Sequence, residues 1–283
     1  MTTPDDIPAE DYRKLNRASW DDRAAAHAAS KDYAVDRFRV DPTFLSNVVQ
    51  FDLPRLGEIA GLDGLHLQCH LGTDTLSLAR LGARMTGLDF SGESLGQARG
   101  LAEETGAKIE YVQSDVYDAV DVLGTERFDL VFTGVGALCW LPDVRRWAAV
   151  VARLLRPGGR LFLREGHPVL WAIDEERPDG LLVLEYPYFE REEPLVWHDD
   201  NTYVQTDATF THNKIHNWNH GLGEVVTALL EESLTLTGLV EHDSVPWEAF
   251  PGRMERVSGD EWRVADRPWR MPLTYTLQAS KPR

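Results

Sequence analysis

The chain has 283 residues, enough for one large α/β domain with a sizeable core or at most two small domains. Its formal net charge of −17 gives a surface that repels nucleic acid backbones and anionic lipid headgroups, so neither is an expected partner. The two cysteines, Cys69 and Cys139, are too few for a disulfide framework in a chain of this length. The acidic N-terminus MTTPDDIPAEDYRK lacks the apolar core of a signal peptide, and no apolar run reaches the length of a membrane span, which predicts a cytoplasmic protein.

The first 60 residues are expected to form a helical cap. Residues 10–29 favour helix and place Tyr12, Leu15, Trp20 and Ala24 roughly on one face. A second helix is predicted from Pro42 to Ile59, where apolar residues again recur at helical spacing.

Residues 61–168 alternate between strand and helix patterns. Strands are predicted at residues 65–69, 84–89, 108–113, 128–133 and 160–166, and helices at residues 73–82, 91–106 and 142–155. Ser91 is the expected N-cap of the helix over 91–106, which ends at Gly106. Repeated β-α units predict a parallel sheet with helices on both of its faces.

Residues 169–215 break this alternation. The stretch 181–197, continued through Phe210, is rich in aromatic residues and predicts antiparallel strands, an insertion placed to act as a substrate lid. Residues 216–283 are expected to return to the sheet, with a helix at 223–234 and closing strands at 234–243 and 272–280. All four segments are expected to belong to one domain overall.

Polar residues gather where the predicted strands end. In an open parallel sheet, ligands bind in the crevice at the carboxyl ends of the strands. The first strand ends in QCHLGTD (68–74) and leads directly into a helix, whose free N–H groups face that crevice. The second strand ends in Asp89, an acid placed to accept hydrogen bonds from ribose hydroxyls. The third is followed by SDV (114–116), the fourth ends in TGVG (133–136), and the fifth ends in EGHP (165–168).

These motifs resemble those of the class I S-adenosylmethionine (SAM)-dependent methyltransferases. LHLQCHLGTDTLSLARLGARMTGLDFS resembles their first motif and ribose-binding strand, and SDVYD stands where an acid commonly contacts the adenine amino group. FDLVFTGVGALCWLPD resembles the fourth-strand motif, and LLRPGGRLFLREGHP resembles the turn and the fifth strand. The resemblance covers residues 62–170 and is closest to a branch whose first motif reads LHLQCH. It implies a mostly parallel Rossmann-like sheet with its last strand reversed, SAM as cofactor, and a small-molecule methyl acceptor bound by a monomer or homodimer.

The resemblance also implies the residues that bind the cofactor, which are Trp20, Gln68, Cys69, His70, Gly72, Asp74, Thr75, Asp89, Phe90, Ser91, Ser114, Asp115, Val116 and Thr133. For Asp115, capping of a helix is the alternative. One departure stands out, because the common pattern has glycine at the places of Gln68 and His70. Either this loop keeps φ below zero and uses those two side chains as ligands, which we favour, or cofactor binding is impaired.

Methyl transfer requires the acceptor to lie in line with the donor, and a base only where the acceptor holds its proton tightly. His167 and, second, His220 are the candidates to act as base or to orient the acceptor, and for each the alternative is a hydrogen-bonded structural role. Aromatic residues that would line the substrate pocket, or simply pack, are Trp140, Trp218 and Tyr203. His212 and His216 precede His220 at intervals of four, but the Asn-rich segment argues against a helix, so no metal is predicted.

Three other functions compete with methyl transfer. A nucleotide-dependent oxidoreductase lacks support, because no Gly-x-Gly-x-x-Gly follows any predicted strand. The missing first-motif glycines keep open a catalytically silent binding module. A SAM-binding enzyme of other chemistry also stays open, since a fold does not specify a reaction.

Overall fold

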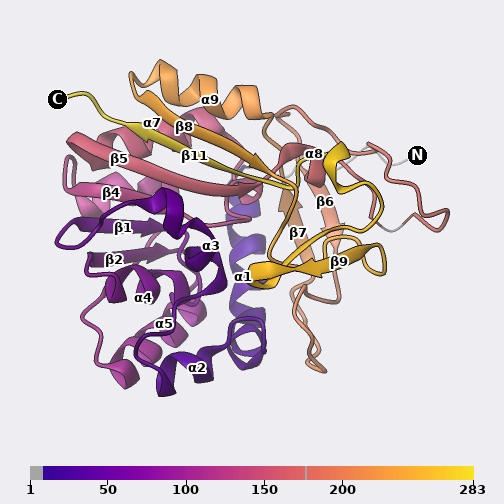
Figure 1. Ribbon diagram of the computed structural model, residues 1–283, viewed down its shortest axis with the longest axis horizontal. Coiled ribbons are helices and arrows are strands. Elements are labelled where there is room, and N and C mark those ends of the chain that lie inside the picture. The colour runs from indigo at the N-terminus through magenta and orange to yellow at the C-terminus, as the bar shows by residue number, and fades with distance from the viewer. Residues whose placement is uncertain (1–8, 176) are drawn as a thin grey trace.

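The computed structural model describes residues 9–175 and 177–283, and a seven-stranded sheet forms its centre (Figure 1). The strand order is β3-β2-β1-β4-β5-β11-β8. The strands are β1 (Asp63–Leu67), β2 (Arg84–Asp89), β3 (Glu110–Gln113), β4 (Phe128–Thr133), β5 (Leu155–Gly166), β8 (Thr235–His242) and β11 (Thr274–Ser280). Strands β1 to β5 pair in parallel, whereas β11 runs antiparallel to both β5 and β8. The predicted Rossmann-like sheet with a reversed last strand is therefore confirmed.

Helices cover both faces of this sheet. On one face α6 (Ala119–Leu123), α7 (Val144–Leu154) and α9 (Leu222–Glu231) share a core with the strands, and on the other α3 (Asn47–Leu56) and α4 (Thr73–Arg80) pack over β4 and β5. Helix α5 (Gly92–Thr105) packs beside β3 and against the first two helices of the chain. In α7 the buried residues Val144, Trp147, Ala148 and Val151 recur at helical spacing, which explains why one face of that helix turns to the core.

The N-terminal segment contains α1 (Ala9–Ala29), which confirms the first predicted helix, and α2 (Val35–Val40), which the sequence pattern did not reveal. The helix predicted from Pro42 to Ile59 is too long, because α3 begins only at Asn47. Ser46 stands outside that helix and its side chain accepts a hydrogen bond from Val49 N, so it is the N-cap.

The region between β5 and α9 departs most from prediction. It holds the short helix α8 (Pro168–Trp171) and one hairpin of β6 (Leu195–His198) and β7 (Lys214–Asn217), so the antiparallel strands predicted over 181–210 are wrong for most of that stretch. Side chains bind its carbonyl groups in place of a partner strand, since Asn219 donates to Pro187 O and Trp218 to Glu192 O. A second hairpin, β9 (Met254–Val257) and β10 (Glu261–Val264), was not predicted and lies beyond the same end of the sheet as β6 and β7 (Figure 1).

A buried charge network attaches the β9–β10 hairpin to the sheet. Arg164 of β5 is fully buried, and its Nη2 donates to Glu261 Oε2 at 2.8 Å. Ser244 Oγ donates to the same oxygen at 2.8 Å. On the other side, the guanidinium lies 3.7 Å from the ring centroid of Phe51, and Asp52 Oδ2 is 3.9 Å from its Nε. One cation thus joins α3, β5 and the hairpin. No helix among the described residues is both long and apolar enough to cross a membrane.

We expect Glu261→Gln to destabilise the protein by roughly 3–5 kcal/mol, because it removes the nearer carboxylate of the buried Arg164 and leaves only Asp52, 3.9 Å away, as its counter-charge. Glu255 is the matched control in the same hairpin, since it pairs with Arg263 at the surface and Glu255→Gln should cost about 0–1 kcal/mol. Urea unfolding of both variants measures the difference. Equal losses would contradict the role assigned to the network.

Candidate active site

The loop between β1 and α4 has left-handed backbone at three positions. The φ angle is +56° at Gln68, +48° at His70 and +72° at Gly72, so the expectation that positions 68 and 70 keep φ below zero is wrong. Such a backbone costs a non-glycine residue about 1–2 kcal/mol. Hydrogen bonds offset this cost, since Gln68 Nε2 donates to Ala137 O at 2.8 Å and the His70 Nδ1 lies 3.0 Å from Ser94 Oγ. The loop therefore keeps a glycine-like shape without two glycines.

Gly72 is the residue in this loop that no side chain can replace. It stands at the N-cap of α4, and a Cβ there would lie 2.4 Å from Tyr111 Oη and 2.9 Å from Ala98 Cβ. In the first turn of α4, Thr75 Oγ1 lies 2.9 Å from the His66 imidazole. The neighbouring Asp74 and Cys69 are also turned inward, Asp74 with its carboxylate hydrogen-bonded to Ser46 and Cys69 almost fully buried.

Asp89 ends β2 beside this loop. Its two carboxylate oxygens accept hydrogen bonds from His70 N at 2.8 Å and Ser91 N at 2.9 Å. Burial raises the pKa of Asp89 to about 6, although these backbone hydrogen bonds oppose the shift. The Phe90 N–H also bonds to this carboxylate, and an ionised carboxylate has about four acceptor positions, so capacity remains for a hydroxyl group of a ligand. The predicted N-cap is confirmed, because Ser91 Oγ accepts from Ser94 N.

The carboxyl end of β3 meets α1. Asp115 Oδ1 accepts from Tyr117 N at 2.9 Å, and so caps the 3₁₀ turn η1 (Val116–Asp118). Its other oxygen lies 3.2 Å from Arg13 Nε of α1. Ser114 N donates to Asp89 O, which brings the ends of β2 and β3 together. The capping role weighed for Asp115 is therefore present, and a cation from α1 faces the free side of its carboxylate.

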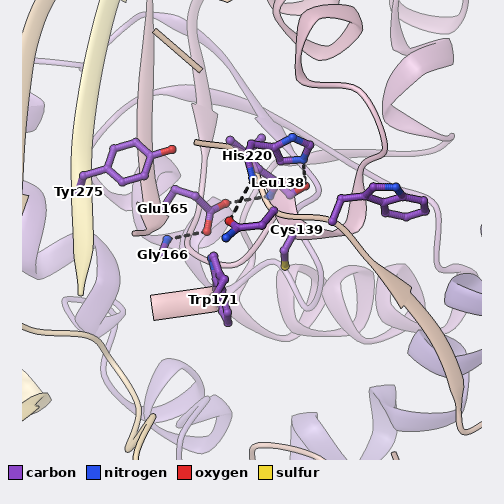
Figure 2. Close-up of a pocket in the computed structure, with 9 residues that line it drawn as sticks. Leu138, Cys139, Glu165, Gly166, Trp171, His220 and Tyr275 are labelled. Atoms are coloured by element: carbon purple, nitrogen blue, oxygen red, sulfur yellow. Dashed lines mark hydrogen bonds between the residues drawn. The ribbon is translucent and has the colours of Figure 1, made fainter. Parts of the chain in front are cut away.

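The loop after β4 is organised by Glu165, the next-to-last residue of β5. Its buried carboxylate accepts hydrogen bonds from Gly136 N at 2.6 Å and Ala137 N at 2.9 Å. It also accepts from Leu138 N at 2.8 Å and Gly166 N at 2.6 Å, which Figure 2 shows. Burial raises the pKa of Glu165, opposed by these four bonds. Sequence reasoning did not single out this residue. The available signal was an acid near the end of the otherwise apolar run LFLREG.

His220 binds the far side of the same loop. Its Nε2 lies 3.0 Å from Leu138 O and 2.8 Å from Leu141 O, and its Nδ1 lies 2.7 Å from Glu190 Oε2. Although burial opposes it, the hydrogen bond from His220 lowers the pKa of Glu190. Because both ring nitrogens already face acceptor atoms of the protein, neither is turned toward a substrate.

His167 has a comparable supporting position. Its Nδ1 accepts from Val169 N at 3.1 Å and caps α8, while its Nε2 lies 3.0 Å from Glu241 Oε1. Burial lowers the pKa of His167, and Glu241 opposes that shift. The base or orienting role predicted for this residue and for His220 stays a prediction.

The three histidines spaced by four do not come together. His212 is exposed, His216 lies on strand β7 rather than on a helix, and His220 is buried against Glu190. Within residues 9–175 and 177–283, no three His, Cys, Asp or Glu side chains are grouped so that they could hold a metal ion.

An aromatic cluster fills the space between α1 and the strand ends. The Trp20 ring lies 4.7 Å from the ring of His70 and 5.1 Å from that of Trp140, between centroids. His27 Nδ1 lies 2.9 Å from His70 Nε2 and 3.3 Å from the hydroxyl of Tyr203. Burial lowers the pKa of His27 to about 4 and that of His70 well below its usual range, so both rings are neutral at pH 7. Of the predicted aromatic residues, Trp20 contacts the first loop directly, Trp140 packs on Trp20, and Tyr203 packs on His27. Trp218 lies farther along, against Tyr12.

Helix α1 is tied to the insertion by buried side chains. The Arg23 guanidinium donates to the carbonyl oxygens of Asp199, Asn201 and His212. Asn16 exchanges two hydrogen bonds of 2.9 Å with the backbone of His216. The helix and residues 199–216 therefore form one cover over the carboxyl ends of the strands.

Comparison with known proteins identifies the central part of the chain. Residues 65–159 match a family model described as a methyltransferase domain. Ubiquinone biosynthesis O-methyltransferase of Yersinia pestis is 36% identical over 124 residues, which are 44% of this chain and 49% of that protein. The chain thus spans about half the length of the curated relatives it matches.

Solved structures match a larger part of this chain than the curated relatives do. An S-adenosylmethionine-dependent methyltransferase from Mesorhizobium loti has a TM-score of 0.55 and 18% identity, covering 83% of this chain and 98% of that one. The Burkholderia thailandensis 1,6-didemethyltoxoflavin-N1-methyltransferase, solved with bound 1,6-didemethyltoxoflavin and S-adenosylhomocysteine, has a TM-score of 0.54 and 16% identity, covering 100% of this chain and 94% of that one. The fold of this chain is that of the SAM-dependent methyltransferases.

We expect Gly72→Ala to destabilise the protein more than Gly106→Ala. Both glycines have left-handed backbone, with φ of +72° and +68°, so the conformational cost of about 1–2 kcal/mol is shared. Only at position 72 does the new Cβ meet other atoms, which adds roughly 1–3 kcal/mol of overpacking. Urea unfolding measures both. Equal destabilisation would show that Tyr111 and Ala98 give way freely.

Proposed function

We propose that this chain, whose residues 65–159 form a methyltransferase domain, transfers a methyl group from SAM to a small organic molecule. The observation that carries the proposal is the left-handed loop after β1 placed directly against Asp89. It keeps the backbone shape of a cofactor loop at positions where two glycines are missing. The silent binding module loses its main support, because the substitutions at 68 and 70 have not altered that shape.

The residues at the strand ends fit the parts of SAM. Gln68 Oε1 and Thr133 Oγ1 are buried polar atoms without a hydrogen-bond partner among the described residues, and they end neighbouring strands. We assign them to the amino-acid end of the cofactor, where an ammonium group needs acceptors. Asp89 would accept the ribose hydroxyls. The adenine would lie against the ends of β2 and β3, near Phe90, Ser91, Ser114, Asp115 and Val116. Gly72 and the first turn of α4, with Asp74 and Thr75, support the loop.

SAM supplies a methyl group already activated by its sulfonium charge. The protein's part is then to hold the acceptor in line and to exclude water. Trp20, Trp140 and Tyr203, carried by or packed against the cover of α1 and residues 199–216, would keep water from the site. We assign His167 and His220 an orienting role rather than that of a base, because each already binds backbone groups or a carboxylate.

The acceptor is proposed to be a small molecule rather than nucleic acid, since the net charge of −17 repels a phosphate backbone. The curated relative in Yersinia pestis is named for O-methylation and the Burkholderia structure for N-methylation, so the fold does not fix the acceptor atom. We further propose that the protein acts in the cytoplasm, as a monomer or homodimer.

Calorimetric titration with S-adenosylhomocysteine tests the cofactor site. We expect micromolar binding at pH 7.5, which weakens about tenfold by pH 5 because protonation of Asp89, whose pKa is about 6, removes the acceptor of the ribose hydroxyls. The buried histidines His27 and His70 contribute little over this range, since burial lowers their pKa values below it or to its edge. The affinity for S-adenosylhomocysteine therefore falls as the pH falls, because the protonated Asp89 is the weaker acceptor.

Asp89→Asn should weaken binding at pH 7.5 by roughly 10- to 100-fold, the loss expected for hydrogen bonds to a charged group, and should abolish the pH dependence. Asp121→Asn, an exposed change on α6, is the matched control and should behave as wild type. If the folded wild-type protein does not bind S-adenosylhomocysteine at all, the proposed function is wrong.

A further inference from the structure

We propose that the acceptor binds in the cavity between Trp171, Trp218 and Tyr275, and that it is an uncharged aromatic ring with an oxygen substituent. This inference rests on the proposed methyltransferase function and adds the chemical class of its substrate. It is supported by the position of the cavity, by its aromatic walls and by the two hydrogen-bond donors that remain free in it.

The cavity lies where a methyl acceptor must lie. It opens at the carboxyl end of β5 and the amino end of the antiparallel β11, and Leu138 and Cys139 of the loop after β4 form one side (Figure 2). That loop is also bonded to Gln68 of the first loop through Ala137. The cavity therefore borders the cofactor loops without being part of them. Its volume of about 10 Å³ holds one water molecule, so a ring enters only when the walls separate.

The walls are aromatic rings from three different elements. Tyr275 comes from β11 and is 1% exposed, Trp218 follows β7 and is 5% exposed, and Trp171 ends α8. Trp171 stacks on Trp247 with centroids 5.7 Å apart, and its other neighbour is Gly166, where a Cβ would lie 2.5 Å from the indole. The glycine thus leaves the space that the indole fills. Aromatic walls favour stacking or edge contacts with a planar ligand.

The charged groups around the cavity are already satisfied. The Glu165 carboxylate accepts four backbone N–H groups, and both nitrogens of His220 face acceptors. Asn219 donates to two carbonyl oxygens and accepts from His220 N. An ionic ligand would find no free counter-charge here, and burying an unpaired charge is costly.

Two donors remain. Neither the Tyr275 hydroxyl nor the Trp171 indole N–H has a hydrogen-bond partner among the described residues, and the Tyr275 hydroxyl points toward the cavity (Figure 2). The Cys139 thiol is used, since it donates to Gly136 O at 3.5 Å. Free O–H and N–H groups in an apolar pocket match a ligand oxygen, as in a phenol or a ring ketone.

Ligand-observed NMR with phenol as the probe tests this assignment, in the presence of saturating S-adenosylhomocysteine. We expect saturation transfer to phenol but not to cyclohexanol, which has the same hydroxyl on a non-planar ring, nor to benzylamine, which is charged. Tyr275→Phe should weaken phenol binding about 5- to 10-fold, the loss of one hydrogen bond. Trp171→Leu should abolish the signal.

The control variant is Trp269→Leu, an exposed tryptophan outside the cavity that should leave phenol binding unchanged. Every variant should still bind S-adenosylhomocysteine as wild type, which shows that it is folded. Cofactor binding without phenol binding, or phenol binding unaffected by Tyr275→Phe and Trp171→Leu, would overturn the acceptor assignment alone. Loss of cofactor binding in the wild type would overturn the proposed function, and this inference with it.

Discussion

One buried carboxylate holds the candidate site together. Glu165 gives its two oxygens to four backbone N–H groups, three of which belong to consecutive residues of the loop after β4. A loop with three adjacent N–H groups turned inward needs such an anion, since unpaired buried donors are costly. The same loop carries Cys139, which lines the cavity, and Trp140, which packs on Trp20, and its Ala137 carbonyl accepts a hydrogen bond from Gln68. The cofactor loop, the cavity and the aromatic cluster are therefore all placed relative to Glu165.

Side chains of α1 likewise hold the cover over the site in position. Its Arg23 and Asn16 bind backbone groups of the insertion, while its Asp21 accepts from Ser91 Oγ at 2.7 Å in the loop after β2. One helix is thus bonded both to the insertion and to the sheet. The aromatic cluster lies between these attachments, so a displacement of α1 would separate Trp20 from His70 and Trp140 together.

The repeated β-α pattern was sufficient to predict the sheet, because strands buried on both faces read as apolar runs. Helix α5 also carries clear end signals, since it begins after the N-cap Ser91 and ends at Gly106. The insertion was not predictable in this way. Its aromatic residues suggested strands, but its backbone is bound by Asn219 and Trp218, which follow it by about thirty positions in the chain. The sequence identified Gln68 as a departure from the common motif, but the φ predicted for it was wrong. The hydrogen bond that offsets the strain goes to Ala137, which is distant in the chain and so leaves no signal in the local sequence pattern. Glu165 was missed for the same reason.

In the loop between β1 and α4, hydrogen bonds to residues distant in the chain stabilise a left-handed backbone. Glycine would adopt φ near +50° at positions 68 and 70 without strain and in any surroundings. Gln68 and His70 adopt it at a cost that the hydrogen bonds to Ala137, Ser94 and His27 offset. His27 belongs to α1 and Ala137 to the loop held by Glu165. The shape of the cofactor loop is consequently linked to the position of the cover and of the loop after β4, a coupling that a glycine-rich loop would lack. The departure from the common motif thus makes three separate segments depend on one another.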